Sequence, residues 1–219
     1  MRQIADKALR KGYADVDTVG EEAEQTHQHV RQDVAVVSLE QQPAALAALL
    51  ATIAEEPFYK VMVFFTTARV TGFMSEAFNS MGVDVLEIHS RKSQSQRTKT
   101  SDIFRQPGSK VLFTSDVTAR GMDYPDVTHV IQVGLTEREQ YIHRLGRTAR
   151  AGKSGQGLLL LAPFEERQML SDLQDMALNR LDLAALDIDT KGAALVTALQ
   201  KVPSNSQLKK SAEQVIMDM

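Results

Sequence analysis

The chain has 219 residues, of which 43% are hydrophobic and 24% are charged, and its formal net charge is −3. These values are ordinary for a globular domain with one sizeable core and an appendage. The absence of cysteine excludes disulfides, thiolate metal sites and cysteine catalysis, and it fits a reducing, intracellular compartment. No apolar run reaches the roughly 18 residues of a membrane span, so no membrane partner is expected. The slightly acidic charge argues against a nonspecific nucleic-acid binder.

Short apolar runs alternate with amphipathic stretches from about residue 29 onward, which predicts alternating strands and helices. Strands are expected near residues 30–37, 61–65, 83–88, 111–113, 127–133 and 157–161, and helices near 46–53, 70–81, 94–106 and 137–150. This alternation is typical of an α/β fold with a parallel sheet and helices on both faces. Because ligands bind beyond the carboxyl ends of such strands, residues just after Phe65, Ile88 and Phe113 should share one rim.

Beyond Pro163 the strand patterns stop, and a helical extension is expected. Its apolar residues recur at helical spacing in three groups: Met169, Leu170, Leu173, Met176 and Ala177; Leu195, Val196 and Leu199; and Leu208, Ala212, Val215 and Ile216. The predicted organisation is therefore a polar lead-in or linker over 1–28, a sheet domain over 29–163 and a helical C-terminal extension over 164–219.

A cationic motif, YIHRLGRTARAG, begins at Tyr141. On a helix, His143, Arg147 and Arg150 fall at i, i+4 and i+7 and so share one face, while Ile142, Leu145 and Ala149 share another. Cations this close repel one another unless an anion lies opposite, and guanidinium groups suit phosphate oxygens. A nucleotide triphosphate at the carboxyl edge of the sheet would supply that anion. A solvated charged face is the alternative for an isolated arginine-rich helix.

A second motif, TSDVTARGMD, begins at Thr114, where a buried strand ends. Thr114 can donate its hydroxyl to a phosphate, Arg120 adds positive charge, and Gly121 permits a close backbone approach. Asp123 could accept hydrogen bonds from a ribose. The alternative is a simple strand-to-loop turn in which Asp116 caps a short helix.

Together the two motifs resemble motifs V and VI of DEAD-box RNA helicases, and the resemblance covers about residues 29–163. Motif VI is matched by His143-Arg144-x-Gly146-Arg147-x-x-Arg150 and motif V by Arg120-Gly121-x-Asp123. Further matches are Val63-Phe64-Phe65-Thr66-Thr67 to motif IV, His89-x-x-x-x-Gln94-x-x-Arg97 to the HGxxxQxxR element, and Thr26-His27 with Gln32 to the segment entering this domain. The sequence from Arg120 to Pro125 and the helical tail are most similar to fungal mitochondrial RNA chaperones of this family. This resemblance implies a mitochondrial location.

The resemblance implies the second of two RecA-like domains of an ATP-dependent RNA helicase. Arg147 and Arg150 would be arginine fingers for the γ-phosphate of ATP, Asp123 with Gly121 would bind the nucleotide, and His143 would contact the Asp-Glu-Ala-Asp motif of the N-terminal RecA-like domain. The residues implied to line the RNA backbone are Thr67, Gln94, Arg97, Thr114 and Arg120. Such contacts give little sequence specificity, because they involve no stacking aromatic side chain.

The chain contains neither a P-loop nor an Asp-Glu-Ala-Asp sequence. The stretch from Gly146 to Ser154 has five residues between its glycines and follows a helix, whereas a P-loop has four and follows a strand. ATP with Mg²⁺ would therefore be bound mainly by the other domain. The chain alone is predicted to be monomeric, to bind nucleotide weakly and to lack ATPase activity.

One residue departs from the family pattern, since Ser90 stands where a glycine usually follows the motif histidine. If a phosphate contacts this backbone, Ser90 could weaken the approach or require strain.

Two other functions stay open: a different helicase-superfamily motor, such as a DNA repair helicase or remodeller, and a stand-alone RNA-binding or partner-docking module. For the helical tail, bracing of the domain is favoured over RNA bending or partner docking.

Overall fold

The computed structural model describes residues 30–116, 123–150 and 152–193, together with residues 197, 209, 210 and 212. Within them, seven strands form one sheet in the order β3-β4-β2-β5-β6-β1-β7, and every neighbouring pair is parallel. The strands are β1 (Val30–Val36), β2 (Lys60–Phe64), β3 (Val85–Ile88), β4 (Lys110–Thr114), β5 (His129–Val133), β6 (Gly155–Leu161) and β7 (Leu178–Arg180). The predicted α/β fold with a parallel sheet is confirmed.

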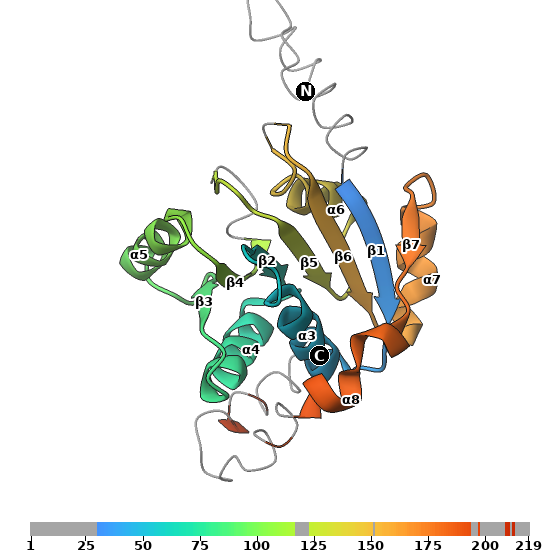
Figure 1. Cartoon of the computed structure of the whole chain (residues 1–219), viewed down its shortest axis with the longest axis horizontal. Helices are drawn as coiled ribbons and strands as arrows, with labels where there is room; N and C mark the ends of the chain where they lie inside the picture. Colours follow the sequence, from blue (N-terminus) through green and yellow to red (C-terminus); the bar gives the residue numbers. More distant parts are fainter. Residues whose placement is uncertain are drawn as a thin grey trace, which may run out of the picture.

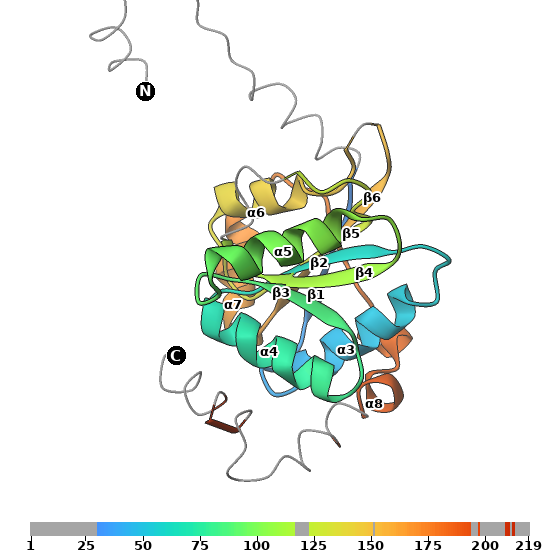
Figure 2. The same cartoon turned by 90° about the vertical axis from the view of Figure 1, so that its left-hand side faces the viewer.

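Helices cover both faces of the sheet, so the fold has three layers (Figures 1 and 2). They are α3 (Gln42–Ile53), α4 (Ala68–Ser80), α5 (Gln94–Arg105), α6 (Arg138–Leu145), α7 (Pro163–Asp172), α8 (Ile188–Lys191) and the short 3₁₀ helix η2 (Leu183–Leu186). Helices α3 and α4 lie on one face, and α5, α6 and α7 lie on the other. In β2, Val61 and Val63 join the core under α3 and α4, whereas Met62 and Phe64 join the core under α5. This alternation follows from the two-residue period of a strand.

The parallel arrangement gives the sheet two chemically different edges, named here the carboxyl edge and the amino edge after the strand ends that they contain. Helix α4 begins just after β2 with Thr67 as its N-cap, and α5 follows β3 with Ser93 as its N-cap. Both helix N-termini therefore lie at the carboxyl edge, where their free amides favour anions. Helix α6 follows β5 and runs back across the sheet, so its C-terminal end leads to the start of β6 at the amino edge.

The C-terminal extension contributes a strand, so the prediction that strands stop beyond Pro163 is wrong. Strand β7 pairs in parallel with β1, and Leu178 lies opposite Gln32. Helix α7 ends at Asp172, and residues 176–177 lie outside the helix predicted for them. The physical reason is that β1 would otherwise be the outermost strand of the sheet, with one side of its backbone unpaired. Strand β7 forms hydrogen bonds with those backbone groups.

The predicted lead-in over 1–28 lies outside the described residues, as do most residues of the helices predicted around Leu195 and Leu208. Thr197, Lys209, Lys210 and Ala212 are described, and all four are helical. None of the helices in the described part of the chain is long and apolar enough to cross a bilayer. The division of the chain at Pro163 stays a prediction, although the sheet itself extends past it.

Candidate functional site

The arginines of the cationic motif lie in a turn between α6 and β6, which corrects the prediction of one helical stripe. Helix α6 ends at Leu145, Gly146 is its C-cap, and Ala149 has a φ of 54°. The chain must reverse here to enter β6, so the helix cannot continue to Arg150. Arg147 Nε donates to the carbonyl of residue 143 at 3.1 Å, and Arg150 Nε donates to that of residue 146 at 2.8 Å. Both side chains thus satisfy carbonyls at the end of the helix.

The two motifs meet in this turn, because the carboxylate of Asp123 pairs with the guanidinium of Arg150. Burial and the neighbouring positive charge of Arg150 lower the pKa of Arg147, whereas Asp123 opposes that effect. A cavity of about 370 Å³ opens beside the two arginines. Arg147, Arg150 and Lys153 line this cavity together with the carboxylate of Asp126, and Asp123 reaches it through its pair with Arg150. The excess of positive charge matches an anionic ligand.

This cavity lies at the amino edge rather than the carboxyl edge, which corrects a second expectation. Phe58 precedes β2, Thr128 precedes β5 and Ser154 precedes β6, and all three line it. The cause is the direction of α6, which carries its last turn away from the carboxyl ends of the strands. His143 is half-buried in the last turn of α6, and its side chain is not joined to Arg147 or Arg150 by any hydrogen bond among the described residues.

The predicted RNA-contacting residues Thr67, Gln94 and Arg97 do lie at the carboxyl edge. Thr67 Oγ1 accepts a hydrogen bond from the amide of Val70 at 3.2 Å, so it serves as the α4 N-cap while remaining exposed. Gln94 is exposed in the first turn of α5, and the buried Nε of Arg97 has no hydrogen-bond partner in the described part of the chain. The edge therefore offers a hydroxyl, an amide and a guanidinium, together with two helix N-termini, to a phosphate backbone.

Thr114 does not face a ligand in this conformation, which corrects the prediction for its hydroxyl. The residue is fully buried, and Oγ1 donates to the carbonyl of Ile88 at 2.8 Å. Ile88 is also the β3 residue that pairs with Thr114 in the sheet. The hydroxyl therefore joins the carboxyl ends of β3 and β4. Arg120 and Gly121 lie outside the described residues.

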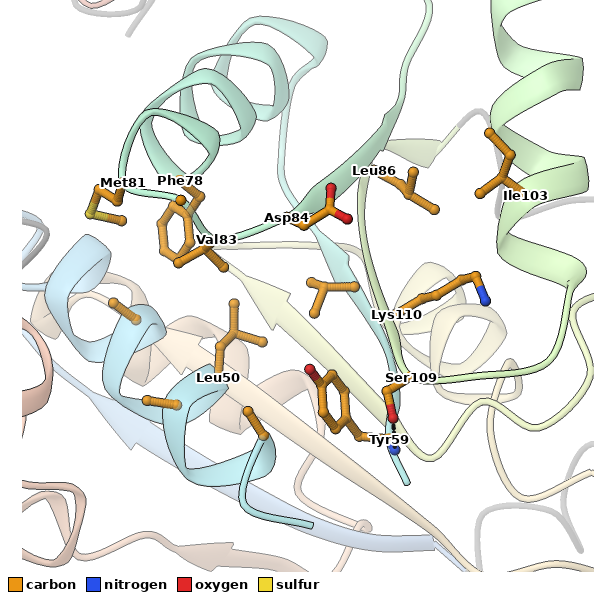
Figure 3. A pocket seen from close by; sticks show the side chains of 15 residues that line it. Leu50, Tyr59, Phe78, Met81, Val83, Asp84, Leu86, Ile103, Ser109 and Lys110 are labelled. Atoms are coloured by element: carbon orange, nitrogen blue, oxygen red, sulfur yellow. Dashed lines mark hydrogen bonds between the residues drawn. The ribbon is translucent and has the colours of Figure 1, made fainter. Parts of the chain in front are cut away.

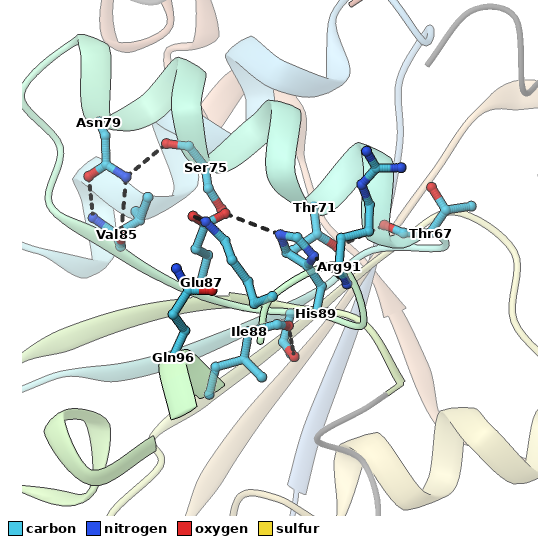
Figure 4. A network of polar contacts seen from close by, with 12 residues as sticks. Thr67, Thr71, Ser75, Asn79, Val85, Glu87, Ile88, His89, Arg91 and Gln96 are labelled. Carbon is cyan, nitrogen blue, oxygen red and sulfur yellow. Dashed lines mark hydrogen bonds and ion pairs between the residues drawn. The ribbon is translucent and has the colours of Figure 1, made fainter. Parts of the chain in front are cut away.

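A polar network holds the loop between β3 and α5 (Figure 4). His89 is buried, its Nδ1 accepts from the amide of Arg91 at 3.3 Å, and its Nε2 lies 3.3 Å from a carboxylate oxygen of Glu87. Burial alone would raise the pKa of Glu87, but hydrogen bonds from His89 and Lys92 hold that pKa below its ordinary value. Ser90 is not among the described residues with a positive φ, so no left-handed strain is required at the position where the family has glycine.

The sequence reasoning missed an ion pair that joins α6 to the end of β4. Arg144 is only 1% exposed, its Nε donates to Oδ1 of Asp116 at 2.9 Å, and its guanidinium lies 5.3 Å from the centre of the Phe64 ring. A signal was available, because Tyr141, Arg144 and Leu145 have the i, i+3 and i+4 spacing of one buried face. The apolar residues 142, 145 and 149 predict a different buried face.

A family model of the helicase conserved C-terminal domain matches residues 41–152, about half of the chain. The chain is 47% identical over 209 residues to DEAD-box ATP-dependent RNA helicase 26 of Oryza sativa subsp. japonica, covering 94% of this chain and 39% of the relative. The chain belongs to the DEAD-box branch of this helicase family. DEAD-box ATP-dependent RNA helicase 31 of Arabidopsis thaliana is 49% identical over 192 residues, which cover 87% of this chain and 27% of that protein. This DEAD-box domain thus spans well under half the length of these curated relatives.

Solved structures confirm the RecA-like fold of the DEAD-box domain. Mss116p bound to ssRNA and AMP-PNP is 25% identical, with a TM-score of 0.70 over 88% of this chain and 38% of that one. The Mss116p DEAD-box helicase domain 2 bound to an RNA duplex is 26% identical, with a TM-score of 0.61 over 84% of this chain and 80% of that one. The second match shows that the similarity extends over most of an isolated second domain.

Proposed function

We propose that this DEAD-box domain is the second RecA-like domain of an ATP-dependent RNA helicase, supplying one wall of an ATP site and half of an RNA-backbone groove. The observation that carries the proposal is the meeting of Asp123 with Arg147 and Arg150 in one turn. These residues come from two separate motifs, and only the fold brings them together. They lie apart from the RNA candidates of the carboxyl edge, so the two ligands would bind at different edges of one rigid sheet.

The residues of the turn fit the triphosphate and ribose of ATP. The guanidinium groups of Arg147 and Arg150 can bind phosphate oxygens in a forked geometry. The carboxylate of Asp123 is 78% exposed and can accept a ribose hydroxyl when Arg150 turns to the phosphate. Bound ATP supplies the phosphoanhydride bond whose hydrolysis ends the closed state, and the N-terminal domain would hold its Mg²⁺. Without that domain, the arginines have no held γ-phosphate to act on, so the chain alone is inactive.

At the carboxyl edge, Thr67, Gln94 and Arg97 would bind phosphates of a single RNA strand. These three candidates carry a hydroxyl, an amide and a guanidinium group, which favours backbone over base recognition. Two solved relatives of this domain were bound to ssRNA and to an RNA duplex, respectively. Closure of the two domains on one strand would bend it and separate a short duplex.

The decisive experiment replaces single arginines in the full-length protein. Arg147→Ala or Arg150→Ala should lower the rate of ATP hydrolysis by roughly 10³–10⁵, which is the usual effect of an arginine finger. RNA affinity measured by fluorescence anisotropy should stay within about twofold, because these residues lie away from the carboxyl edge. Lys153→Ala is the matched control: this cation lines the same cavity but pairs with Asp126. Loss of RNA binding with intact hydrolysis would reverse the two assignments.

A stand-alone RNA-binding or partner-docking module is the second candidate, favoured by the lack of a P-loop in this chain. It predicts that the natural protein has no ATP-binding domain upstream and that Arg150→Ala has no effect on function. The complete reading frame decides between the two, because the first proposal requires an upstream P-loop and Asp-Glu-Ala-Asp motif.

A further inference from the structure

A polar cavity of about 560 Å³ lies between α4 and β3, which is the outermost strand at one side of the sheet. One end of the cavity lies at the carboxyl edge, because Ala68 in the first turn of α4 and Arg91 in the loop after β3 both line it. Thr67, an exposed RNA candidate, immediately precedes this end. The cavity therefore begins beside the proposed RNA-backbone groove, and the function proposed above does not use it.

The charged side chains in the wall of this cavity leave one cation open to an anionic ligand. The wall carries three cations and two carboxylates: Arg69, Arg91, Lys92, Glu76 and Glu87. Glu87 is already neutralised, since Lys92 pairs with it and Nε2 of His89 lies 3.3 Å from its carboxylate. Arg69 and Glu76 each make an interaction of their own. Arg91, by contrast, is exposed and forms no ion pair within the described part of the chain.

The loop that carries Arg91 is held in place by a buried histidine. The amide of Arg91 donates to Nδ1 of His89 at 3.3 Å, and the amide of Lys92 donates to the His89 carbonyl at 3.1 Å. His89 also lies against α4, because a Cβ added to Gly72 would be 3.4 Å from its Nε2. The side chain of Arg91 extends from this loop toward the start of α4 (Figure 4). The backbone at Arg91 is thus preorganised, which lowers the entropic cost of binding a ligand there.

Another cavity, of about 500 Å³ between α3, α4 and α5, lacks this excess of positive charge (Figure 3). Asp84 and Lys110 are the charged residues in its wall, and they balance each other. Lys110 Nζ is also engaged, since it donates to the carbonyls of Gln106 at 3.2 Å and Pro107 at 2.6 Å. Of these two cavities, only the one beside Arg91 suits a phosphate.

We propose that the guanidinium of Arg91 binds a backbone phosphate of the RNA strand and so extends the groove from Thr67 along α4 and β3. This inference rests on the proposed function, because it requires RNA at the carboxyl edge. A guanidinium fork matches phosphate oxygens, and the free amides at the start of α4 add positive partial charge at the same end of the cavity. The contact is to the backbone, so it should be equally strong for every RNA sequence.

The salt dependence of RNA binding counts phosphate contacts and therefore tests the proposal. The affinity of the full-length protein for a fluorescein-labelled oligouridine is measured by anisotropy at a series of KCl concentrations. Arg91→Gln should reduce the slope of log affinity against log [KCl] by about 0.7, the value for one phosphate of a single strand. It should also lower the affinity up to about fivefold, as for an exposed charge pair. Oligoadenosine should give the same changes; an unchanged slope, or a loss confined to one base, would overturn the proposal.

Two further variants separate a phosphate contact from a general loss of positive charge. Lys99→Gln removes the same charge from an exposed position of α5 that is outside the wall of the cavity, and it should leave the slope nearly unchanged. Arg91→Lys keeps the charge without the planar fork, so it should restore most of the slope. Equal slopes for Arg91→Gln and Lys99→Gln would reduce the effect to overall charge and refute the assignment.

Arg97→Gln reports on the proposed groove itself, so the two claims can fail separately. If Arg97→Gln reduces the slope and Arg91→Gln does not, the groove stands and its extension is refuted. If neither variant changes the slope, RNA does not bind at the carboxyl edge, and the proposed function fails together with the inference.

Discussion

The carboxylate of Asp123 holds the guanidinium of Arg150 across 27 residues of sequence, in a pair that remains open to water. A solvent-exposed ion pair contributes at most about 1 kcal/mol, so a nucleotide can exchange it at little cost. We predict that Asp123→Asn in the full-length protein raises the KM for ATP about tenfold, or ~1.4 kcal/mol, with a smaller change in kcat. Steady-state ATPase assays check this. Asp126→Asn, which loses the pair with Lys153 and weakens a longer-range attraction to Lys60, should leave KM nearly unchanged.

Two threonines at the carboxyl edge should respond differently to the loss of a hydroxyl. Thr114→Val removes the buried hydrogen bond to Ile88 and should lower the free energy of unfolding by about 1–2 kcal/mol, with RNA affinity unchanged. Thr67 is exposed at the start of α4, so Thr67→Val should weaken RNA binding as well as removing the helix cap. RNA titrations and urea denaturation separate the two effects. An RNA-binding defect in Thr114→Val, with stability unchanged, would restore the role first predicted for that hydroxyl.

The Arg144–Asp116 pair should be asymmetric in its contribution to stability. Asp116→Ala leaves a buried guanidinium without its carboxylate and should cost about 3–5 kcal/mol. Arg144→Met replaces that cation by an apolar side chain of similar length and should change stability by no more than ~1 kcal/mol, because Asp116 is partly exposed to water. Denaturant unfolding of the two single variants and the double variant measures this. The reverse order of stabilities would show that the carboxylate, not the guanidinium, is the group that needs its partner.

The stability of the domain should fall as the pH drops below about 6.5. Burial lowers the pKa of His129, and the nearby carboxylate of Glu56 opposes this only in part. The unfolded chain then binds the proton more readily than the folded chain, so His129 stabilises the fold above the unfolded pKa of about 6.5. This contribution is lost as the pH falls through the lower, folded value. Urea denaturation at several pH values between about 7.5 and 5.5 should show the decline, and His129→Gln should reduce it.

The order of elements up to β6 was predictable because each of these strands carries a local signal. The unbroken apolar run of β2 indicates a strand buried on both faces, and the alternating core contacts of Val61 and Met62 confirm this. The RNA candidates Thr67 and Gln94 could be placed at one edge, since a parallel sheet fixes where strands end. The prediction of a mitochondrial location has no counterpart in the fold and stays a prediction.

What the sequence could not supply was the length of α6. Helical spacing alone put Arg147 and Arg150 on a stripe, but Gly146 ends the helix and Ala149 turns the chain. The spacing of Arg144 with Tyr141 and Leu145 indicated its buried face, but its carboxylate partner was hidden, because Asp116 lies 28 residues away. Strand β7 has only three residues, too few to show a hydrophobic pattern of its own. It forms because the backbone of β1 needs hydrogen-bonding partners on its outer side.

Strand β7 has a practical consequence for anyone who shortens this domain. A chain cut after Pro163 would keep every helicase motif yet strip β1 of the neighbour that Leu178–Arg180 provides. The exposed backbone of β1 would then be a template for other chains, and such a product should aggregate at concentrations where the longer chain stays dispersed.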